Sequence, residues 1–304
     1  AATIRAGHFR LDVGKQFVRW GRADIIYPTD RFAPRDYMNV ITTELLPVLG
    51  ARASIQAGNE TFEGVWVPRL TPSRLPLADQ RWAPSVPGGA ALLDAGGTIP
   101  GGSQFGARWR HTGSRIETAV SFFDGFNHQP DIELTPRPVL GAIEFRRVYP
   151  TIRMYGGDVA IPTPWVTIKA EMAYVTSPPE TSDEYALYVI ELERQAGNWL
   201  LDGGYANEDV RIRRVAATFS PDRSLAGSII GRASYSEDPK QTLVFEAAID
   251  RHGDGYYSKA EFSQGMGRHW RLTVTGVALG GEDTNFLGQY RRNSHGEVAL
   301  RFSY

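Results

Sequence analysis

Apolar and polar residues alternate with a period of two through most of this chain. In the segment 240–250, Leu243 and Phe245 share one side, and Thr242 and Glu246 share the other. This period is typical of a β-strand with one apolar face and one polar face. Similar segments, separated by turns rich in Gly, Asn, Asp and Pro, lie at 3–10, 13–21, 49–57, 61–69, about 105–110, 115–122, 139–147, 153–161, 165–175, 185–194, 198–205, 212–220, 227–236, 240–250, 256–264, 268–279 and 295–304. Evenly spaced strands of this kind predict an all-β sandwich or barrel.

Strand length and the nature of the two faces favour a membrane barrel over a soluble sandwich or propeller. The segments run for about 9–11 residues, which is the length a tilted strand needs to cross a bilayer, whereas soluble strands average about 5–6. The polar face carries many charges, while the opposite face is apolar. Aromatic residues gather near strand ends, where interfacial girdles lie in such barrels: Trp165, Tyr174, Tyr185, Trp199, Tyr205, Tyr235, Tyr256, Trp270 and Tyr304. We therefore predict a transmembrane antiparallel up-and-down β-barrel of about 16–18 strands.

Bulk composition excludes several other classes. The chain has 304 residues, with 33 Lys and Arg against 34 Asp and Glu, and this balance argues against a nucleic-acid partner. It has no cysteine, so a disulfide framework, a thiolate metal site and a cysteine nucleophile are all excluded. It contains no apolar run long enough for a transmembrane helix and no signal peptide at its start, which we interpret as a processed sequence.

We expect one barrel over residues 1–304. We place the C-terminus in the periplasm, count the strands backwards from it and let each strand cross the membrane once, which gives about seventeen strands. Bacterial single-chain barrels usually have an even number of strands. Either one N-terminal strand is missing from this chain, or one hairpin is wrongly split. The count places the segment 177–183 on the periplasmic side and four long loops on the extracellular side, at about 22–45, 70–102, 125–138 and 280–293. The terminal aromatic residue Tyr304 is typical of the closing strand of such a barrel.

The stretch DRHGDGYYSKAE, residues 250–261, has nearly the spacing of an EF-hand calcium loop. An EF-hand needs a helix on each side, and the glycines of FSQGMGRHW rule out the second helix. His252 is also a poor ligand for a hard cation. We therefore interpret residues 253–255 as the tip of a hairpin and expect no metal site and no cofactor.

No constellation of catalytic residues stands out, so we do not expect an enzyme. The six histidines, at 8, 111, 128, 252, 269 and 295, are scattered, and neither an HExxH nor a GxSxG motif occurs. The glycine pairs at 88–89, 96–97 and 101–102 precede no helix and are interpreted as loop residues rather than a phosphate site.

The polar face is the candidate functional surface, because it would line the lumen of a barrel. The predicted pore-lining residues are Arg52, Arg108, Arg110, Arg115, Glu117, Glu144, Arg146, Lys169, Glu171, Glu191, Arg232, Lys259, Arg271 and Arg301. Arg108, Arg110 and Arg115 share one hairpin and are candidates for a local basic ladder. Loops 22–45 and 70–102 are expected to constrict the channel, with Asp30, Arg31, Arg35 and Asp36 at the constriction. The charges on this face either pair across strands or tune passage.

The N-terminal stretch LDVGKQFVRWGRADIIYPTDRFAPRDY, followed by GVWVPRLTPSRLP, resembles porin-like outer-membrane proteins of Gram-negative bacteria. The similar elements are Gly14-Lys15-Gln16, Trp20-Gly21, Pro28-Thr29-Asp30 and Pro34-Arg35-Asp36-Tyr37. This group is loosely related to alginate-export-type barrels. The resemblance implies a 16–18-stranded channel whose first long loop folds into or over the mouth. The mixed charge of the lumen departs from the basic excess expected of an alginate exporter.

We expect this protein to lie in the outer membrane of a Gram-negative bacterium, in contact with membrane lipid and lipopolysaccharide. The main hypothesis is a channel for small polar solutes. The alternative is a structural or docking barrel whose lumen is filled by an envelope protein partner. A third interpretation is a soluble β protein with calcium bound at 250–261.

Overall fold

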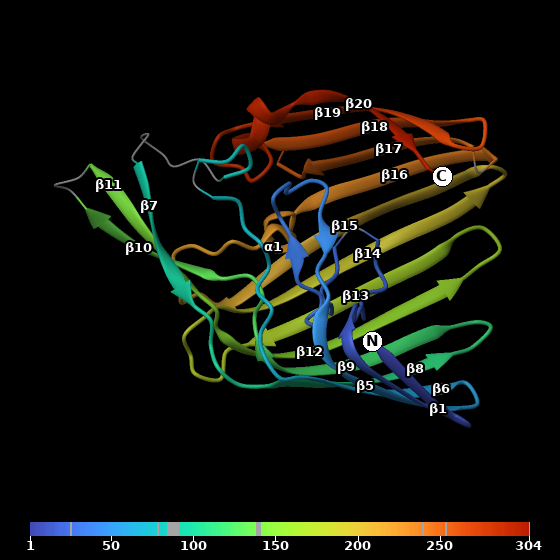
Figure 1. Cartoon of the computed structure of the whole chain (residues 1–304), viewed down its shortest axis with the longest axis horizontal. Coiled ribbons are helices and arrows are strands. Elements are labelled where there is room, and N and C mark those ends of the chain that lie inside the picture. Colours follow the sequence, from blue (N-terminus) through green and yellow to red (C-terminus); the bar gives the residue numbers. More distant parts are fainter. Residues whose placement is uncertain are drawn as a thin grey trace.

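A single large antiparallel sheet dominates the computed structural model, which describes residues 1–24, 26–77, 79–83, 91–137, 141–238, 240–252 and 254–303. The sheet has fifteen strands and curves into a wall (Figure 1). Its strands, in spatial order, are β1 (Ala2–Ala6), β2 (Phe9–Gln16), β5 (Val48–Ala57), β6 (Glu60–Val67), β8 (Gln104–Thr112), β9 (Glu117–Phe126), β12 (Thr151–Pro162), β13 (Thr167–Thr176), β14 (Glu184–Ala196), β15 (Trp199–Ile212), β16 (Ser228–Asp238), β17 (Gln241–Asp250), β18 (Gly255–Met266), β19 (Trp270–Gly281) and β20 (His295–Phe302).

The remaining elements lie outside this wall. A three-stranded sheet of order β10-β11-β7 extends from one end of the wall (Figure 1). Its strands are β7 (Ala91–Thr98), β10 (Asp131–Arg137) and β11 (Ala142–Val148), and a two-stranded ribbon pairs β3 (Arg35–Asp36) with β4 (Glu44–Leu45). The helical elements are the short α1 (Pro221–Ser224) and the 3₁₀ turn η3 (Gly288–Asn293). Within the described ranges, no helix is long and apolar enough to cross a membrane.

The two ends of the wall differ in the length of their connections. At one end, on the right in Figure 1, the strands are joined by tight turns at 7–8, 58–59, 113–116, 163–166, 197–198 and 267–269. At the other end lie the longer connections 17–47, 68–103, 127–150, 177–183, 213–227 and 282–294. We call these the short-turn end and the long-loop end. In barrels of this type, short turns and long loops occupy opposite sides of the membrane.

The apolar face of the wall points outward and the polar face points inward. On β19, Val274 is 42% exposed beside Phe262 and Val298, its outward neighbours on β18 and β20. The buried apolar residues instead lie inside the curve, where wall residues such as Phe123 and Met154 meet the inward connection 17–47. A continuous exposed apolar surface of this kind marks contact with a membrane or with another protein rather than with water.

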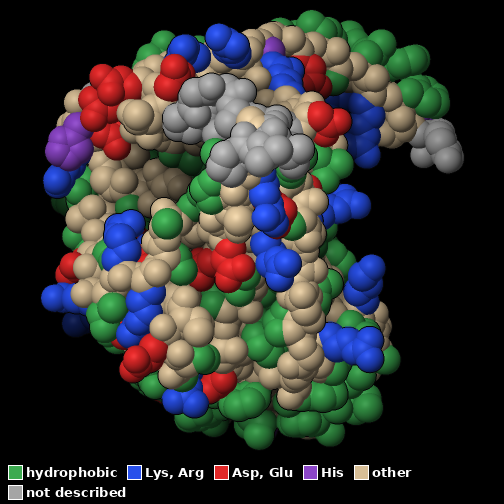
Figure 2. Space-filling view, turned by 90° about the vertical axis from the view of Figure 1, so that its left-hand side faces the viewer, with side chains coloured by type: hydrophobic (Ala, Val, Ile, Leu, Met, Phe, Trp, Pro, Cys, Tyr) green, Lys and Arg blue, Asp and Glu red, His purple; other side chains and the backbone are tan. Residues whose placement is uncertain are grey.

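The sheet is an open arc rather than a closed ring. Strands β1 and β20 form its two edges and, across the described ranges, do not pair with each other. Figure 2, which looks onto the long-loop end, shows the wall as a curve with a gap along one side. All the described residues of β1 are exposed, as are nearly all those of β20.

Two of the expected wall strands are wrong. The segment 139–147 contributes β11 to the three-stranded sheet, and the segment 212–220 leaves the wall after Ile212 and bridges to Asp131 through Thr218. Counting these two segments as wall strands assigns every connection between them to the wrong end of the wall. For that reason the segment 177–183, expected among the short turns, lies at the long-loop end, where Asp183 contacts Arg214 and Arg223.

The calcium-loop stretch is a hairpin connection between strands. Strand β17 ends at Asp250 and β18 begins at Gly255, and the two pair in antiparallel register. The backbone N–H of His252 donates to the Asp250 carboxylate at 2.8 Å, which closes a local turn. Strands on both sides exclude an EF-hand, which needs helices. Gly253 of the expected hairpin tip and the terminal Tyr304 lie outside the described residues.

We predict that two adjacent arginine substitutions on β19 will differ sharply. Val274→Arg puts a charge on the outward face and should lower the free energy of unfolding by about 2–4 kcal/mol near the bilayer midplane. Thr275→Arg, on the inward face between Glu261 and Glu297, should cost much less. Urea unfolding in lipid vesicles, followed by tryptophan fluorescence, measures both. Equal destabilisation by the two substitutions would contradict the assignment of faces.

Candidate functional site

The connection 17–47 turns inward and lies against the inner face of the wall. Its aromatic side chains anchor it there: the Trp20 and Phe32 rings are 5.2 Å apart, and Phe32 is 4.9 Å from Phe123 of β9, both in edge-to-face geometry. Strand β2 ends at Gln16, four residues before Trp20, so this part of the predicted strand 13–21 belongs to the inward segment. We call residues 17–47 the constriction loop.

Two inward-facing glycines let the loop approach the wall closely. A Cβ atom on Gly106 of β8 would lie 2.6 Å from the Trp20 ring and 2.8 Å from the Phe32 ring. A Cβ atom on Gly156 of β12 would lie 2.6 Å from the Thr29 side chain. Any larger residue at either position would push the loop away from the wall.

Glu171, on the inward face of β13, holds the loop through its backbone. Its carboxylate accepts hydrogen bonds from the backbone N–H groups of Arg22 at 2.7 Å, Ala23 at 3.0 Å and Thr29 at 2.8 Å. The Thr29 hydroxyl donates to the same carboxylate at 2.8 Å. The residue is only 2% exposed, so these donors replace the water that a carboxylate otherwise requires. Hydrogen bonds to a charged group contribute about 1.5–3 kcal/mol each.

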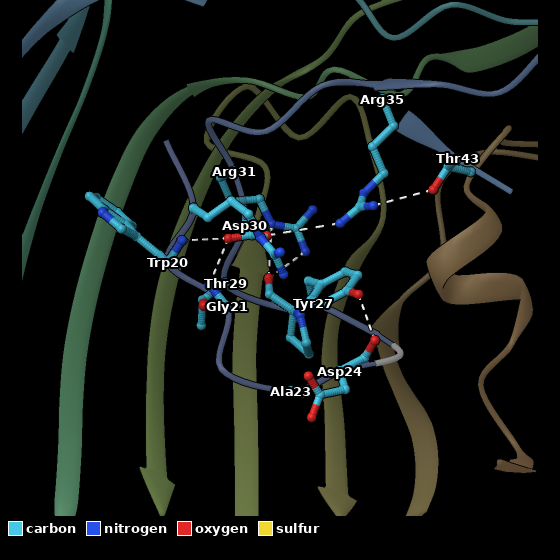
Figure 3. Close-up of polar contacts among 12 residues, drawn as sticks. Trp20, Gly21, Ala23, Asp24, Tyr27, Thr29, Asp30, Arg31, Arg35 and Thr43 are labelled. Carbon is cyan, nitrogen blue, oxygen red and sulfur yellow. Dashed lines mark hydrogen bonds and ion pairs between the residues drawn. The ribbon is translucent and has the colours of Figure 1, made fainter. Parts of the chain in front are cut away.

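Two further carboxylates act in the same way. Glu191 of β14, 1% exposed, accepts from the backbone N–H of Asp24 at 3.0 and 3.2 Å. Within the loop, Asp30 accepts from the backbone N–H groups of Trp20 at 2.5 Å and Gly21 at 2.6 Å (Figure 3). The shape of the loop is therefore fixed by acidic side chains that bind amide groups.

Ion pairs connect the loop to the wall at its sides. The Arg22 guanidinium lies 2.5 Å from Asp158 of β12 and 2.8 Å from Glu117 of β9, and Arg108 of β8 lies 2.7 Å from the same Asp158. On the adjacent strand β13, the Lys169 ammonium lies 2.7 Å from Asp24. These ion pairs fasten the loop to the neighbouring strands β9, β12 and β13.

Nearer the long-loop end, the connection 68–103 supports the constriction loop. The backbone N–H of Arg35 donates to the Ser73 hydroxyl at 3.1 Å, and the Arg74 guanidinium lies 2.8 Å from Asp36. His128, buried at the end of β9, lies between the two connections, because its ring nitrogens contact the carbonyl oxygens of Thr71 and Arg31. Residues 71–75 thus form an outer support for the loop, while β7 of the same connection lies outside the lumen.

A cavity of about 320 Å³ separates the constriction loop from strands β16–β18. Its lining includes three acidic and three basic side chains: Asp24, Asp222, Glu246, Arg35, Arg232 and Lys259. The cavity therefore offers both signs of charge to whatever enters it.

Tyr27 forms the loop side of this cavity. Two guanidinium groups lie over its ring, with Arg19 4.7 Å and Arg35 4.4 Å from the ring centre. Arg35 also donates to the Thr43 hydroxyl at 3.2 Å (Figure 3). At the outer edge of the cavity, burial raises the pKa of the Asp222 carboxyl, against the opposing effect of Arg35 and Arg31.

Most of the predicted pore-lining residues lie on the inner face, but many of their charges are already paired. The inner-face residues are Arg52, Arg108, Arg110, Glu117, Lys169, Glu171, Glu191, Arg232, Lys259, Arg271 and Arg301. Arg52 is paired with Glu63 at 2.5 Å, and Lys259 with Glu261 at 3.1 Å. Glu171 and Glu191 are covered by the loop, so they position it rather than face the lumen.

Three of the predicted pore-lining residues are misplaced. Glu144 and Arg146 lie on β11, in the three-stranded sheet beyond the wall, because the alternation of 139–147 belongs to that sheet. Arg115 lies exposed in the turn 113–116 at the short-turn end. The basic ladder expected of Arg108, Arg110 and Arg115 is therefore absent, and Arg108 is neutralised by Asp158.

The four predicted constriction residues have different surroundings. Arg35 lines the 320 Å³ cavity, whereas Asp30 and Arg31 line a separate hollow of about 20 Å³. Arg31 donates to the carbonyl oxygen of Pro28, at 2.7 Å from one of its terminal nitrogens. Asp36 pairs with Arg74 away from the cavity.

Sequence reasoning did not single out several residues that build this site, notably Arg22, Asp24, Tyr27, Asp158 and Asp222. Asp158 lies at an inward position of an expected strand, so strict alternation was sufficient to find it. The others lie in connections, where no periodic pattern assigns a direction to a side chain. Their partners are up to 167 residues away, as for Asp24 and Glu191.

Comparison with solved structures identifies the fold. No protein-family model and no curated protein matches the sequence. Three porin structures match 99% of this chain. OccAB4 of Acinetobacter baumannii matches with a TM-score of 0.56 and 9% identity over 73% of its own chain. OpdQ of Pseudomonas aeruginosa matches with a TM-score of 0.56 and 11% identity over 79% of its chain, and a BenF-like porin of Pseudomonas fluorescens Pf-5 with a TM-score of 0.55 and 14% identity over 75% of its chain. At these identities the similarity establishes the fold, so the prediction of a porin-like β-barrel fold is confirmed.

We predict that Glu171→Gln will loosen the constriction loop. The uncharged amide accepts hydrogen bonds more weakly, and its NH₂ group faces the backbone donors that the carboxylate now binds. Amide hydrogen exchange of the peptide 19–30 should accelerate by about 10–100-fold, as expected when one charged hydrogen bond of about 1.5–3 kcal/mol is lost. Glu261→Gln, on the wall away from the loop, is the matched control. Unchanged exchange in Glu171→Gln would show that the carboxylate does not hold the loop.

Proposed function

We propose that this protein is a channel of the Gram-negative outer membrane that lets small polar solutes diffuse through a constricted lumen of mixed charge. The observation that carries the proposal is the cavity between the constriction loop and strands β16–β18, with its three acidic and three basic side chains. A water-filled passage lined by charged side chains selects solutes by size and charge. No covalent chemistry is required of any residue in it.

The outward surface supports a membrane location. Large apolar side chains are exposed on many wall strands, including Ile55 at 51%, Val120 at 57% and Ile229 at 61%. This surface suits the acyl chains of membrane lipid and of lipopolysaccharide. The long-loop end, with the constriction loop and the three-stranded sheet, would face outside the cell, and the short-turn end would face the periplasm.

The constriction loop favours a narrowed passage over a lumen filled by a partner. It fills part of the lumen with the chain's own residues and leaves a cavity between itself and strands β16–β18. A structural barrel filled by an envelope protein is the alternative function. It would require the partner to occupy the space that residues 17–47 fill, and none of the contacts among the described residues depends on such a partner.

Current through the purified protein tests the proposal directly. Reconstituted in planar lipid bilayers, the whole chain should give discrete conductance steps. Absence of current at either polarity, together with co-purification of a partner in stoichiometric amount, would favour the filled barrel instead.

We further predict that Tyr27→Ala will raise the single-channel conductance, because the Tyr27 ring, in contact with Arg19 and Arg35, narrows the cavity. Removal of the ring should also admit larger solutes in a liposome-swelling assay. Tyr256→Ala is the matched control, because Tyr256 is 47% exposed on the wall and does not line the cavity. An equal conductance in wild type and Tyr27→Ala would show that the solute passes elsewhere.

A further inference from the structure

Three carboxylates from distant parts of the chain converge beside the constriction. They belong to Asp24 of the constriction loop, Glu193 of β14 and Asp202 of β15, and one oxygen from each lies within 4.8 Å of the others. Glu193 and Asp202 are directly opposite each other in the β14–β15 pair. Like charges at opposed positions destabilise a sheet, so this arrangement needs a compensating cation.

Lys169 supplies only part of that compensation. Its ammonium lies 2.7 Å from Asp24 and 2.5 Å from Glu193, but it forms no ion pair with Asp202. The neighbouring Arg232 is opposite Asp202 in the β15–β16 pair, yet its guanidinium lies 3.4 Å from Glu246. With three carboxylates and one ammonium, the cluster retains a formal charge of −2.

Of the three carboxylates, that of Asp202 gives the clearest indication of a bound ligand. The residue is only 8% exposed, and its Oδ1 atom is buried with no hydrogen-bond partner in the described part of the chain. A buried carboxylate oxygen without a hydrogen-bond donor is costly, because it has lost water and gained no donor in its place. The carboxylate is nevertheless directed at the other two, toward a point that a cation would share.

We propose that Asp24, Glu193 and Asp202 bind a hard divalent cation, Ca²⁺, at the constriction. Ca²⁺ prefers carboxylate oxygens at about 2.3–2.6 Å, so one ion can reach two oxygens up to about 5 Å apart. Its coordination is flexible and accepts water for the remaining positions. The Asp24 side chain is 41% exposed, which leaves the cluster open to the lumen, and Figure 3 shows Asp24 at the tip of its loop segment.

The bound ion and Lys169 compete for the same oxygens. When Ca²⁺ enters, the Lys169 ammonium must withdraw from Asp24 and Glu193 into the lumen. The three carboxylates then carry a formal charge of −1 with the ion bound. When the displaced Lys169 ammonium is included, the total formal charge of these four side chains and the ion changes from −2 to zero.

Calorimetry on the detergent-purified protein tests this proposal. After treatment with a chelator, titration with CaCl₂ should give saturable binding to one site per chain. Asp202→Asn should weaken binding at least about tenfold, since loss of even an outer partner of a metal ligand costs about 10–100-fold. Lys169→Met should strengthen it, because the competing ammonium is gone.

Glu261→Gln is the matched control, because it removes one carboxylate from the same inner face outside the cluster and should leave the affinity unchanged. A shift in gel migration on boiling checks that each variant is folded. Absence of saturable binding to wild type, or equal affinity in wild type, Asp202→Asn and Lys169→Met, would overturn the proposal. The measurement needs no current, so its failure leaves the channel proposal standing.

Discussion

A buried carboxylate needs hydrogen-bond donors to replace the water it has lost, and the arrangement of the loop inside this wall depends on that requirement. Glu171 and Glu191 lie on inward positions of neighbouring strands, where the loop covers them and excludes water. Backbone N–H groups of the same loop supply the hydrogen bonds that water no longer can. Each partner would be unstable in its place without the other. The position of the loop, the cavity beside it and the side chains that line the cavity all follow from this mutual dependence.

Much of the wall could be predicted from sequence because a strand with lipid on one side and water on the other must alternate. The alternation locates most strands and assigns residues such as Lys169 and Arg232 to the inner face. It fails where the same period has another cause. Strand β11 alternates because it pairs with β10 and β7 beyond the wall, and the sequence of 139–147 carries no mark of that difference. The reversal of sides at 177–183 follows from the extra strand counted at 212–220, because the sides are assigned backwards from the C-terminus.

The constriction could be predicted only in outline. The long connection after β2 indicates a functional loop, but its direction depends on Glu171 and Glu191, which are more than 140 residues away. Alternation places both residues correctly, yet it cannot distinguish a carboxylate that faces water from one that binds the backbone of a loop. The same limit applies to Asp24 and Asp202, whose proximity depends on the path of the loop rather than on any local spacing.

Anchoring through amide groups has a consequence for how this protein can diverge. Every residue except proline carries a backbone N–H, so the hydrogen bonds to Glu171 do not depend on which side chains stand at positions 22 and 23. Those two side chains have constraints of their own, because Arg22 pairs with Asp158 and Ala23 is buried. The backbone of the loop can therefore be conserved while the side chains that line the cavity change. Selection, or an engineer who wants a sensor for a chosen molecule, has a rigid aperture whose lining is replaceable one residue at a time.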